Sequence, residues 1–433
     1  MLFNTYNFIF YFLFPTIIIY KFIPNNFKLW YLIIVSVIFY IQWDLIHFFI
    51  LFTSITINYI FANIIYKVSS YKRVLLWFII FLNIALLGYF KYSGLLHFSD
   101  ENIVLPLAIS FFTFQQIAYL YDVYREKIIL ESLHRYIFFV IFFPQLIAGP
   151  IVHYNEIMKQ VDDKNLFHIT IDKINAGVVL FSIGLFSKVV IADNLLKENY
   201  TSWSDIFSYS FMIYFDFSAY ANMAIGLALM FGIILPVNFN SPYKARNLIE
   251  FWRRWHITLG GFLKEHIYIP LGGNRYGIGK QIFALMTTMI VGGIWHGAGL
   301  NFLLWGAGHG IGLVFPVIFK TIKLHKLFSI IITFLYVSLL WVLFFSNNLD
   351  EALEIYKFLF SFNSFNIEKI DALWLLLCAV IVWFMPNSME IINTQKKDFG
   401  LKAWYAYISA FLFFVSLKFM ADSPSVSFVY FNF

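Results

Sequence analysis

Four short motifs follow one another between Asn238 and Gly312 in this chain. They read Asn238-Phe-Asn-Ser-Pro-Tyr243, Glu250-Phe-Trp-Arg-Arg-Trp-His256, Tyr268-Ile-Pro-Leu-Gly-Gly-Asn-Arg275 and Gly293-Ile-Trp-His296-Gly-Ala298. Basic, aromatic and histidine side chains are concentrated in these motifs, whereas most of the remaining sequence is apolar. This contrast indicates that the chemistry of the protein takes place here.

The composition is that of a membrane protein. Hydrophobic residues make up 61% of the 433 positions and charged residues only 12%, and the mean hydropathy is +0.76. These values lie far outside the range of soluble globular proteins. Cys378 is the single cysteine, so the sequence excludes an intrachain disulfide and a cysteine metal cluster.

Apolar runs long enough to cross a hydrocarbon core of about 30 Å recur along the whole chain. Because backbone polar groups in lipid must be satisfied within the protein, we predict an all-α, polytopic bundle of about eleven to thirteen embedded segments. The expected segments cover residues 8–23, 29–43, 45–66, 74–96, 104–124, 174–192, 206–214, 217–234, 281–295, 300–319, 328–345, 373–385 and 403–420.

The charges between these segments predict the orientation of the chain. Basic residues follow the first, third and fifth segments: Lys21, Lys28, Lys67, Lys72, Arg73, Arg125, Lys127 and Arg135. The intervening connections carry acids instead: Asp44, Asp100 and Glu101. By the positive-inside rule, this alternation places the N-terminus outside.

Two regions do not have the pattern of ordinary spans. The run Phe143-Pro-Gln-Leu-Ile-Ala-Gly-Pro150 interrupts residues 137–161, and proline and glycine at membrane depth predict a re-entrant hairpin or a helix in the membrane plane. From Lys244 to Lys280, seven basic residues and two acids are mixed with aromatic side chains. This mixture predicts an amphipathic or re-entrant element at the cytoplasmic face.

We see no soluble domain in the sequence and expect one integral-membrane domain over residues 1–433, with its core motifs in residues 215–312. An acidic joint at Asp216 separates the expected spans 206–214 and 217–234. Asp216 and Asn222 either line a polar cavity or satisfy helix ends.

His296 is the first candidate for a catalytic residue. It lies 16 residues beyond Lys280, which is a rise of about 24 Å if the stretch is helical, so we expect it within the membrane or toward its outer half. A titratable side chain in the bilayer is costly and indicates a functional site. Imidazole can also exchange a proton near neutral pH. The alternative is a histidine that serves only helix packing.

His256 is the second candidate, at the cytoplasmic end of the motifs. Arg253, Arg254 and Trp255 precede it, and such residues either bind a phosphorylated or pantetheine-linked donor or anchor an interfacial helix. His309 lies 13 residues after His296, a rotation of about 220° on one continuous helix. The two would then not share a face, and we interpret His309 as structural.

The motifs together resemble those of the bacterial membrane-bound O-acyltransferases. The resemblance rests on the four motifs above, on Phe143-Pro-Gln-Leu-Ile-Ala-Gly-Pro150 and on Asp216-Phe-Ser-Ala-Tyr-Ala-Asn-Met-Ala-Ile-Gly226. It covers most of the chain. It implies a helical bundle with a central funnel or tunnel, in the inner membrane of a bacterium.

The resemblance also implies roles for individual residues. His296, in the Trp-His-Gly motif, is expected to be essential for acyl transfer, and His256 to be the second functional position. Candidate donor-binding residues are Arg253, Arg254, Trp255, Trp295 and Asn240. The expected donor is acetyl-CoA or another thioester, used as a substrate, and no bound cofactor or metal is expected.

The Tyr-Ile-Pro-Leu-Gly-Gly-Asn-Arg box and the Trp-His-Gly-Ala motif are similar to those of alginate and peptidoglycan O-acetylation subunits. Abundant Phe, Tyr and Ile indicate AT-rich coding, which argues against alginate producers. We therefore expect O-acetylation of peptidoglycan, with a periplasmic esterase-like partner protein, membrane lipid around the bundle and no nucleic acid. The alternatives are acetylation of alginate or another exopolysaccharide, D-alanyl transfer to teichoic acid, and a proton-coupled transporter or flippase.

Overall fold

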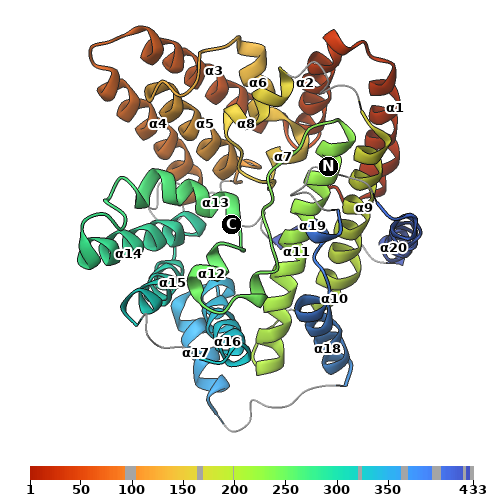
Figure 1. Ribbon diagram of the computed structural model, residues 1–433, viewed down its shortest axis with the longest axis vertical. Coiled ribbons are helices and arrows are strands. Elements are labelled where there is room, and N and C mark those ends of the chain that lie inside the picture. The colour runs from red at the N-terminus through yellow and green to blue at the C-terminus, as the bar shows by residue number, and fades with distance from the viewer. Residues whose placement is uncertain are drawn as a thin grey trace. The chain divides into compact units, whose positions relative to one another are not determined.

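The computed structural model describes residues 1–92, 104–162, 169–197, 199–319, 324–361, 369–392, 401–422 and 426–429. Every regular element in these ranges is a helix (Figure 1), which confirms the predicted all-α class. Residues 93–96, expected at the end of the fourth apolar segment, lie outside the described ranges, as do Asp100 and Glu101.

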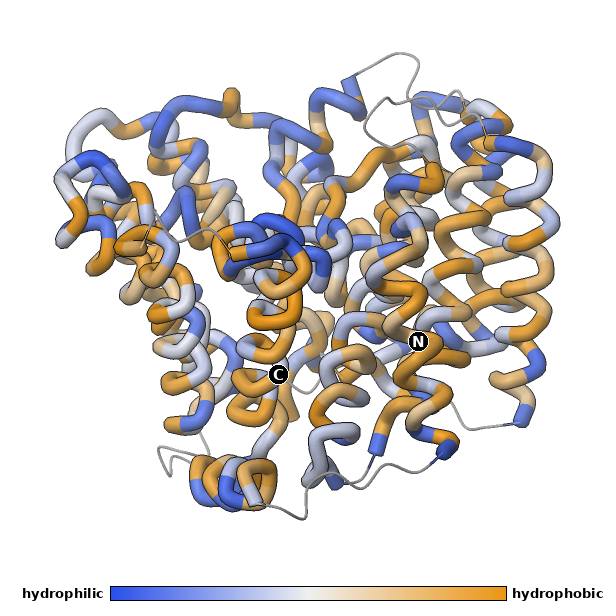
Figure 2. Tube along the Cα trace, turned by 60° about the horizontal axis from the view of Figure 1, so that its bottom comes forward, coloured by the Kyte–Doolittle hydropathy of each residue, from blue (hydrophilic) through white to orange (hydrophobic). Residues whose placement is uncertain are grey.

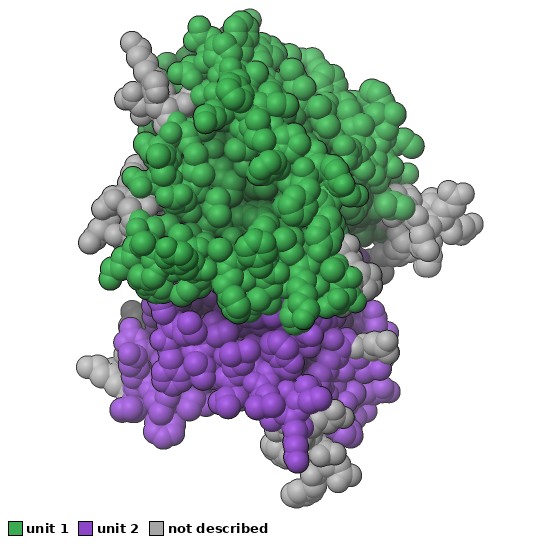
Figure 3. All heavy atoms as spheres, turned by 90° about the vertical axis from the view of Figure 1, so that its right-hand side faces the viewer, with its two compact units in different colours: residues 1–186, 220–236, 398–431 green, residues 187–219, 237–397, 432–433 purple. Residues whose placement is uncertain are grey.

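Two compact units make up the chain, and Figure 3 colours them separately. The first comprises Met1–Phe186, Tyr220–Pro236 and Asp398–Phe431, and the second comprises Ser187–Ala219, Val237–Lys397 and Asn432–Phe433. One long helix, α11 (Trp203–Met230), contributes residues to both units. The single domain over residues 1–433 and its central funnel stay predictions.

Helices of the first unit follow the expected apolar segments closely. They are η1 (Asn7–Leu13), α1 (Phe14–Phe22), α2 (Asn25–Ile41), α3 (Leu45–Lys67), α4 (Lys72–Tyr92), α5 (Ile109–Tyr124), α6 (Leu133–Ile141), α7 (Phe143–Leu146), α8 (Tyr154–Val161), α9 (Ile171–Phe186) and α20 (Ala403–Asp422). The interruption predicted within residues 137–161 is present, because the short helices α6, α7 and α8 replace a single span there.

Two glycines bring α9 and α11 into backbone contact in the first unit. A Cβ added at Gly177 would lie 2.6 Å from the carbonyl oxygen of Gly226, and one added at Gly226 would lie 2.6 Å from the carbonyl oxygen of Gly177. Small residues let helices approach this closely in lipid, where van der Waals packing drives their association. The pair therefore fixes where the two helices cross.

The second unit holds the four motifs on short helices and on the ends of longer ones. Besides its part of α11, its elements are η2 (Ser187–Ala192), α10 (Asp193–Leu195), η3 (Pro242–Lys244), α12 (Leu248–Trp252), α13 (Ile257–Leu263), η4 (Lys264–Tyr268), α14 (Gly277–His296), α15 (Leu300–Ile318), α16 (Lys326–Phe345), α17 (Leu349–Leu359), α18 (Lys369–Phe384) and α19 (Ser388–Ile391). The basic region between Lys244 and Lys280 thus contains short helices in place of a span.

Eight helices among the described residues are long and apolar enough to cross a membrane. They are Leu45–Lys67, Lys72–Tyr92, Ile171–Leu195, Trp203–Met230, Gly277–His296, Leu300–Ile318, Lys326–Phe345 and Ala403–Asp422. Apolar residues occupy most of their length, and polar residues gather toward the ends and connections (Figure 2). Two shorter apolar helices, Asn7–Phe22 and Asn25–Ile41, add to these. The chain is a multi-pass membrane protein.

Residues 206–234 do not form the two spans that the acidic joint predicts. Helix α11 runs without a break through Asp216, whose side chain is buried. The Nζ of Lys188, on η2, lies 2.6 Å from Oδ1 of Asp216 and 2.8 Å from Oδ1 of Asp193. Because a buried carboxylate is tolerated when a cation pairs with it, these ion pairs allow the helix to continue.

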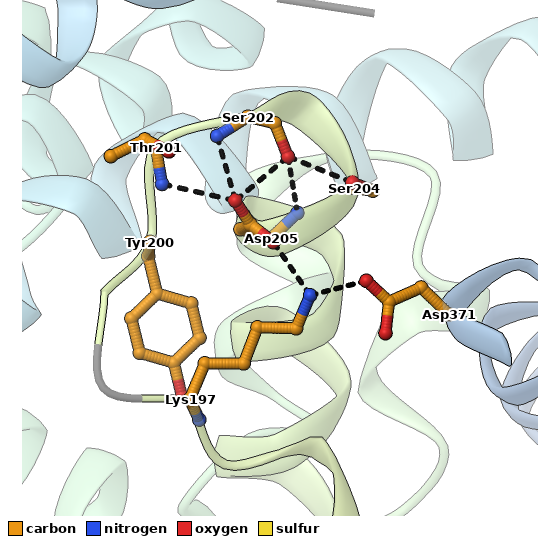
Figure 4. Close-up of polar contacts among 7 residues, drawn as sticks. All are labelled: Lys197, Tyr200, Thr201, Ser202, Ser204, Asp205 and Asp371. Carbon is orange, nitrogen blue, oxygen red and sulfur yellow. Dashed lines mark hydrogen bonds and ion pairs between the residues drawn. The ribbon is translucent and has the colours of Figure 1, made fainter. Parts of the chain in front are cut away.

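A second lysine with two aspartate partners lies where α11 and α18 begin (Figure 4). The Nζ of Lys197 lies 2.7 Å from Oδ1 of Asp205 and 2.5 Å from Oδ2 of Asp371. Asp205 also accepts a hydrogen bond of 2.8 Å from the backbone N–H of Ser202. Burial alone would lower the pKa of Lys197, but its bonds to the two carboxylates raise that pKa above its ordinary value, so the lysine stays charged.

Replacing Lys188 with methionine is expected to lower the free energy of unfolding by about 3–5 kcal/mol, because the buried carboxylate of Asp216 and the half-buried one of Asp193 would lose their cation. The matched control is Lys197→Met, whose lysine side chain is 25% exposed against 1% for Lys188. Water can solvate the acids left by the control, so its loss should be smaller. Thermal unfolding of both variants in detergent measures the difference, and equal losses would contradict this account of α11.

Candidate active site

His296 is the last residue of α14, and its ring lies among aromatic rings. Residues 280–296 are helical, as the estimate of its depth assumed. The side chain is 4% exposed. Its ring centroid lies 4.5 Å from that of Trp295, 5.0 Å from that of Trp305 and 5.1 Å from that of Phe344. An imidazole in these surroundings is removed from bulk water.

Glycines at the contact of α14 with α15 bring His296 next to Trp305. A Cβ added at Gly293 would lie 2.3 Å from the carbonyl oxygen of Phe302, and one added at Gly306 would lie 2.4 Å from that of Met289. No side chain fits between the two backbones at these positions. The close approach therefore depends on glycine in both helices.

His256 lies between α12 and α13 and is fully enclosed. It has a left-handed backbone conformation with φ of 43°. Its Nδ1 lies 3.1 Å from Oδ1 of Asn238, an oxygen that also accepts a 2.8 Å hydrogen bond from the hydroxyl of Thr258. Because this oxygen accepts, Nδ1 of His256 donates, and the lone pair of the neutral ring is on Nε2. Burial lowers the pKa of His256 to about 3, so the ring is neutral near pH 7.

The two predicted arginines have different surroundings. Arg253 lines a cavity in the second unit. Arg254 lies 2.9 Å from Oε1 of Glu250 and donates a 3.1 Å hydrogen bond to the carbonyl oxygen of Asn240. This arginine therefore ties the Asn-Phe-Asn-Ser-Pro-Tyr motif to α12.

Of the three other predicted donor-binding residues, Trp255 and Trp295 are buried and Asn240 is half-buried. Trp255 is 2% exposed and its ring centroid lies 5.1 Å from that of Trp341. Asn240 accepts a 2.9 Å hydrogen bond at Oδ1 from the side chain of Asn387. Trp295 is buried next to His296. None of the three is among the residues that line the Arg253 cavity.

The Arg253 cavity has a volume of about 680 Å³. Three cationic side chains line it: Arg253, Lys264 and Arg275. Trp252 and Tyr268 contribute aromatic rings to the same wall. Cations bind phosphates and aromatic rings offer flat apolar surface, and the volume is typical of a small-molecule site. The cavity can therefore hold an anionic ligand with an apolar arm.

A tight turn between η4 and α14 places part of this wall. Gly272 and Gly273 have φ of 107° and 56°, which residues with a Cβ rarely adopt. The turn positions Asn274 and Arg275 at the cavity that Arg253 also lines. Lys264 and Arg275 were not among the predicted site residues, although the excess of basic residues between Lys244 and Lys280 was a signal for them.

His309 and His296 belong to one group of aromatic rings, although the argument from helical rotation predicted that they do not share a face of one helix. That argument assumed one continuous helix, but α14 ends at His296 and α15 begins at Leu300. The ring of Trp305 contacts both histidines, with centroids 5.0 Å from that of His296 and 4.6 Å from that of His309. The glycines between the helices were the sequence signal for this turn.

Comparison with known proteins gives a consistent result. Residues 123–322 match the model of the MBOAT, membrane-bound O-acyltransferase family. A peptidoglycan O-acetyltransferase of Helicobacter pylori is 39% identical, with 100% of this chain and 98% of the relative covered. A probable alginate O-acetylase AlgI of Pseudomonas aeruginosa is 34% identical over 94% of this chain and 82% of the relative.

A more distant relative is a teichoic acid D-alanyltransferase of Bacillus subtilis, which is 26% identical over 50% of this chain and 60% of the relative. The matched family region, residues 123–322, includes both predicted histidines and the Arg253 cavity. Identity of 39% over the whole chain, together with the match to the family model, leads to one conclusion. The chain belongs to the membrane-bound O-acyltransferase family and is an acyltransferase.

Proposed function

We propose that this protein moves acetyl groups from a cytoplasmic thioester, such as acetyl-CoA, for the O-acetylation of peptidoglycan outside the membrane. The observation that carries the proposal is the similarity over the full length to a peptidoglycan O-acetyltransferase, at 39% identity against 34% for an alginate O-acetylase. The membrane would be the bacterial inner membrane, with the N-terminus outside, as the alternation of charges predicts.

The Arg253 cavity is the proposed donor site. A coenzyme A thioester carries phosphates at one end and a long, largely uncharged arm that ends in the acyl group. The cationic side chains of Arg253, Lys264 and Arg275 can bind the phosphates, and the ring of Trp252 can pack against the arm. This basic region would face the cytoplasm by the positive-inside rule, which is the compartment that supplies acetyl thioesters.

His296 is the proposed general base of the reaction. It takes the proton of an incoming hydroxyl while that oxygen bonds to the thioester carbonyl carbon, and the carbon–sulfur bond then breaks. The imidazolium returns its proton to the departing thiolate. The products are an ester and a free thiol, so no proton is gained or lost overall. His256 acts beside this step as a neutral residue that orders the motif loop through Asn238.

A secreted, esterase-like partner would receive the acetyl group and carry it to the polymer. This proposal follows from the location of peptidoglycan, which lies outside the membrane that the chain spans. The test is deletion of the gene followed by complementation, with mass spectrometry of the muropeptides. Loss of O-acetyl muropeptides that the intact gene restores supports the proposal. Unchanged muropeptides with lost acetylation of an exopolysaccharide would instead favour the alginate-like alternative.

Replacing Arg253 with glutamine is expected to raise the KM for acetyl-CoA about tenfold or more, as removal of one charge-assisted hydrogen bond does. The KM for acetyl-pantetheine, which lacks the phosphates, should change little. The matched control is Arg254→Gln, because Arg254 pairs with Glu250 and is not among the residues lining the cavity. The Arg254→Gln variant should unfold at a lower temperature and keep its KM for acetyl-CoA nearly unchanged. Steady-state kinetics with both donors measure the effect, and equal changes for both donors would contradict the assignment.

A further inference from the structure

His309 is a histidine inside a membrane helix that the proposed reaction does not use. It lies in α15 and is 0% exposed. The Nε1–H of Trp252 donates a hydrogen bond of 3.2 Å to Nδ1 of His309. Because an indole nitrogen can only donate, Nδ1 must carry the lone pair, and the proton of the neutral ring is on Nε2. The contact thus selects one tautomer.

Two of the aromatic neighbours of His309, Trp252 and Trp305, belong to the two parts of the site. Trp252 lines the Arg253 cavity, and its ring centroid lies 5.1 Å from that of His309. Trp305 contacts His309 on another side, with centroids 4.6 Å apart, and contacts His296 with centroids 5.0 Å apart. Trp252 and Trp305 also contact each other, at 6.0 Å. His309 therefore contacts both a residue that lines the cavity, Trp252, and a residue that contacts His296, Trp305.

Packing alone does not explain a histidine at this position. A phenylalanine would fill similar space without polar atoms, and a polar group buried in a membrane span is costly. Nε2 of His309 has no hydrogen-bond partner among the residues that the structure describes, so burial of this nitrogen lowers stability. A buried polar atom without a partner calls for an explanation, such as a function of the other contacts of its side chain. Here the use is the hydrogen bond that orients Trp252.

We infer that His309 is a positioning residue for acyl transfer. Its Nδ1 fixes the indole of Trp252 in the wall of the donor cavity, and its ring holds Trp305 against His296. One buried imidazole thereby holds both the tryptophan beside the thioester arm and the tryptophan beside the general base. This inference rests on the proposed function, since it concerns the same donor and the same base.

The test compares three substitutions at His309 in the full-length protein. The side-chain oxygen of asparagine lies as far from Cα as Nδ1 does and can accept from Trp252, whereas that of glutamine lies as far as Nε2. We expect His309→Asn to keep the KM for acetyl-CoA within about threefold of the unaltered protein. His309→Gln and His309→Phe should raise it about tenfold, the effect of one lost hydrogen bond. His47→Phe is the control, because His47 belongs to α3 of the first unit.

The outcomes separate the inference from the proposed function. Equal KM values for the asparagine and glutamine variants would overturn the inference, and this comparison holds even if the phenylalanine variant does not fold. Unaltered protein that fails to transfer acetyl would overturn the proposed function instead. Calorimetric binding of coenzyme A to the same variants would then decide the inference, with the same order of affinities expected: asparagine close to the unaltered protein, glutamine and phenylalanine weaker.

Discussion

Replacing His296 with alanine is expected to lower the rate of acetyl transfer by about 10²–10⁴-fold, the usual contribution of one general base. The imidazole is the titratable group at the end of α14, and the rings of Trp295, Trp305 and Phe344 around it offer no carboxylate or amine in its place. Acetyl transfer from acetyl-CoA by the purified protein, measured as release of free thiol in the presence of acceptor, gives the rate.

Alanine also leaves a void among the rings, so a second variant is needed to separate chemistry from folding. His296→Gln keeps most of the volume and a polar end but cannot act as a base near neutral pH. It should be as inactive as the alanine variant and should unfold at nearly the temperature of the unaltered protein. His325→Asn, at the exposed N-cap of α16, keeps a side chain that can accept the hydrogen bond from the backbone N–H of Leu327, so it should change neither quantity. An active glutamine variant would remove His296 from the chemistry.

Replacing Gly306 with alanine is expected to lower the free energy of unfolding by about 3 kcal/mol or more, at the upper end of overpacking effects. The new Cβ would lie 2.4 Å from the carbonyl oxygen of Met289 and 3.1 Å from the Cα of Ile290. These are backbone atoms of α14 that no side-chain rotation can move. The helices must separate, and Trp305, the preceding residue, should move away from His296. Activity should therefore fall together with stability.

Gly88→Ala is the matched control for this change. Gly88 also lies in a membrane-spanning helix, α4, but a Cβ added there meets no atom within 4 Å. Alanine is the better helix former by about 1 kcal/mol, so the control should be neutral or slightly stabilising. Thermal unfolding in the same detergent compares the pair. Equal stability of the two variants would contradict the close packing of α14 on α15.

The long helices agreed with their apolar runs because lipid leaves the backbone few alternatives. Residues 45–66 and 328–345 were predicted as spans, and the structure has Leu45–Lys67 and Lys326–Phe345. A run of this length must satisfy its own backbone, so composition alone locates it. The break that was wrongly predicted within α11 depends instead on a contact between residues distant in the sequence. Lys188, which makes Asp216 acceptable inside a helix, lies 28 positions earlier, and this pairing leaves no local signal.

The candidate site was predicted in part for similar reasons. The motif residues His256, His296 and Arg253 could be selected because their types are unusual in an apolar chain, although their roles stay predictions. Trp255 gave the same signal and lies buried against other rings between α12 and α13, and its role in donor binding stays a prediction. His309 was interpreted as structural from its rotation on one continuous helix, and that assumption fails because α14 ends at His296 and α15 begins at Leu300.

The most direct test of the account uses sealed proteoliposomes with labelled acetyl-CoA on the basic side of the membrane and the acceptor protein with muropeptides on the other. Label should appear on the muropeptides only when donor and acceptor are on opposite sides, and the His296→Gln variant should transfer none. Transfer that requires both on the same side, or that persists in the variant, would contradict the claim that an imidazole within the bilayer joins a donor from one face to a hydroxyl from the other.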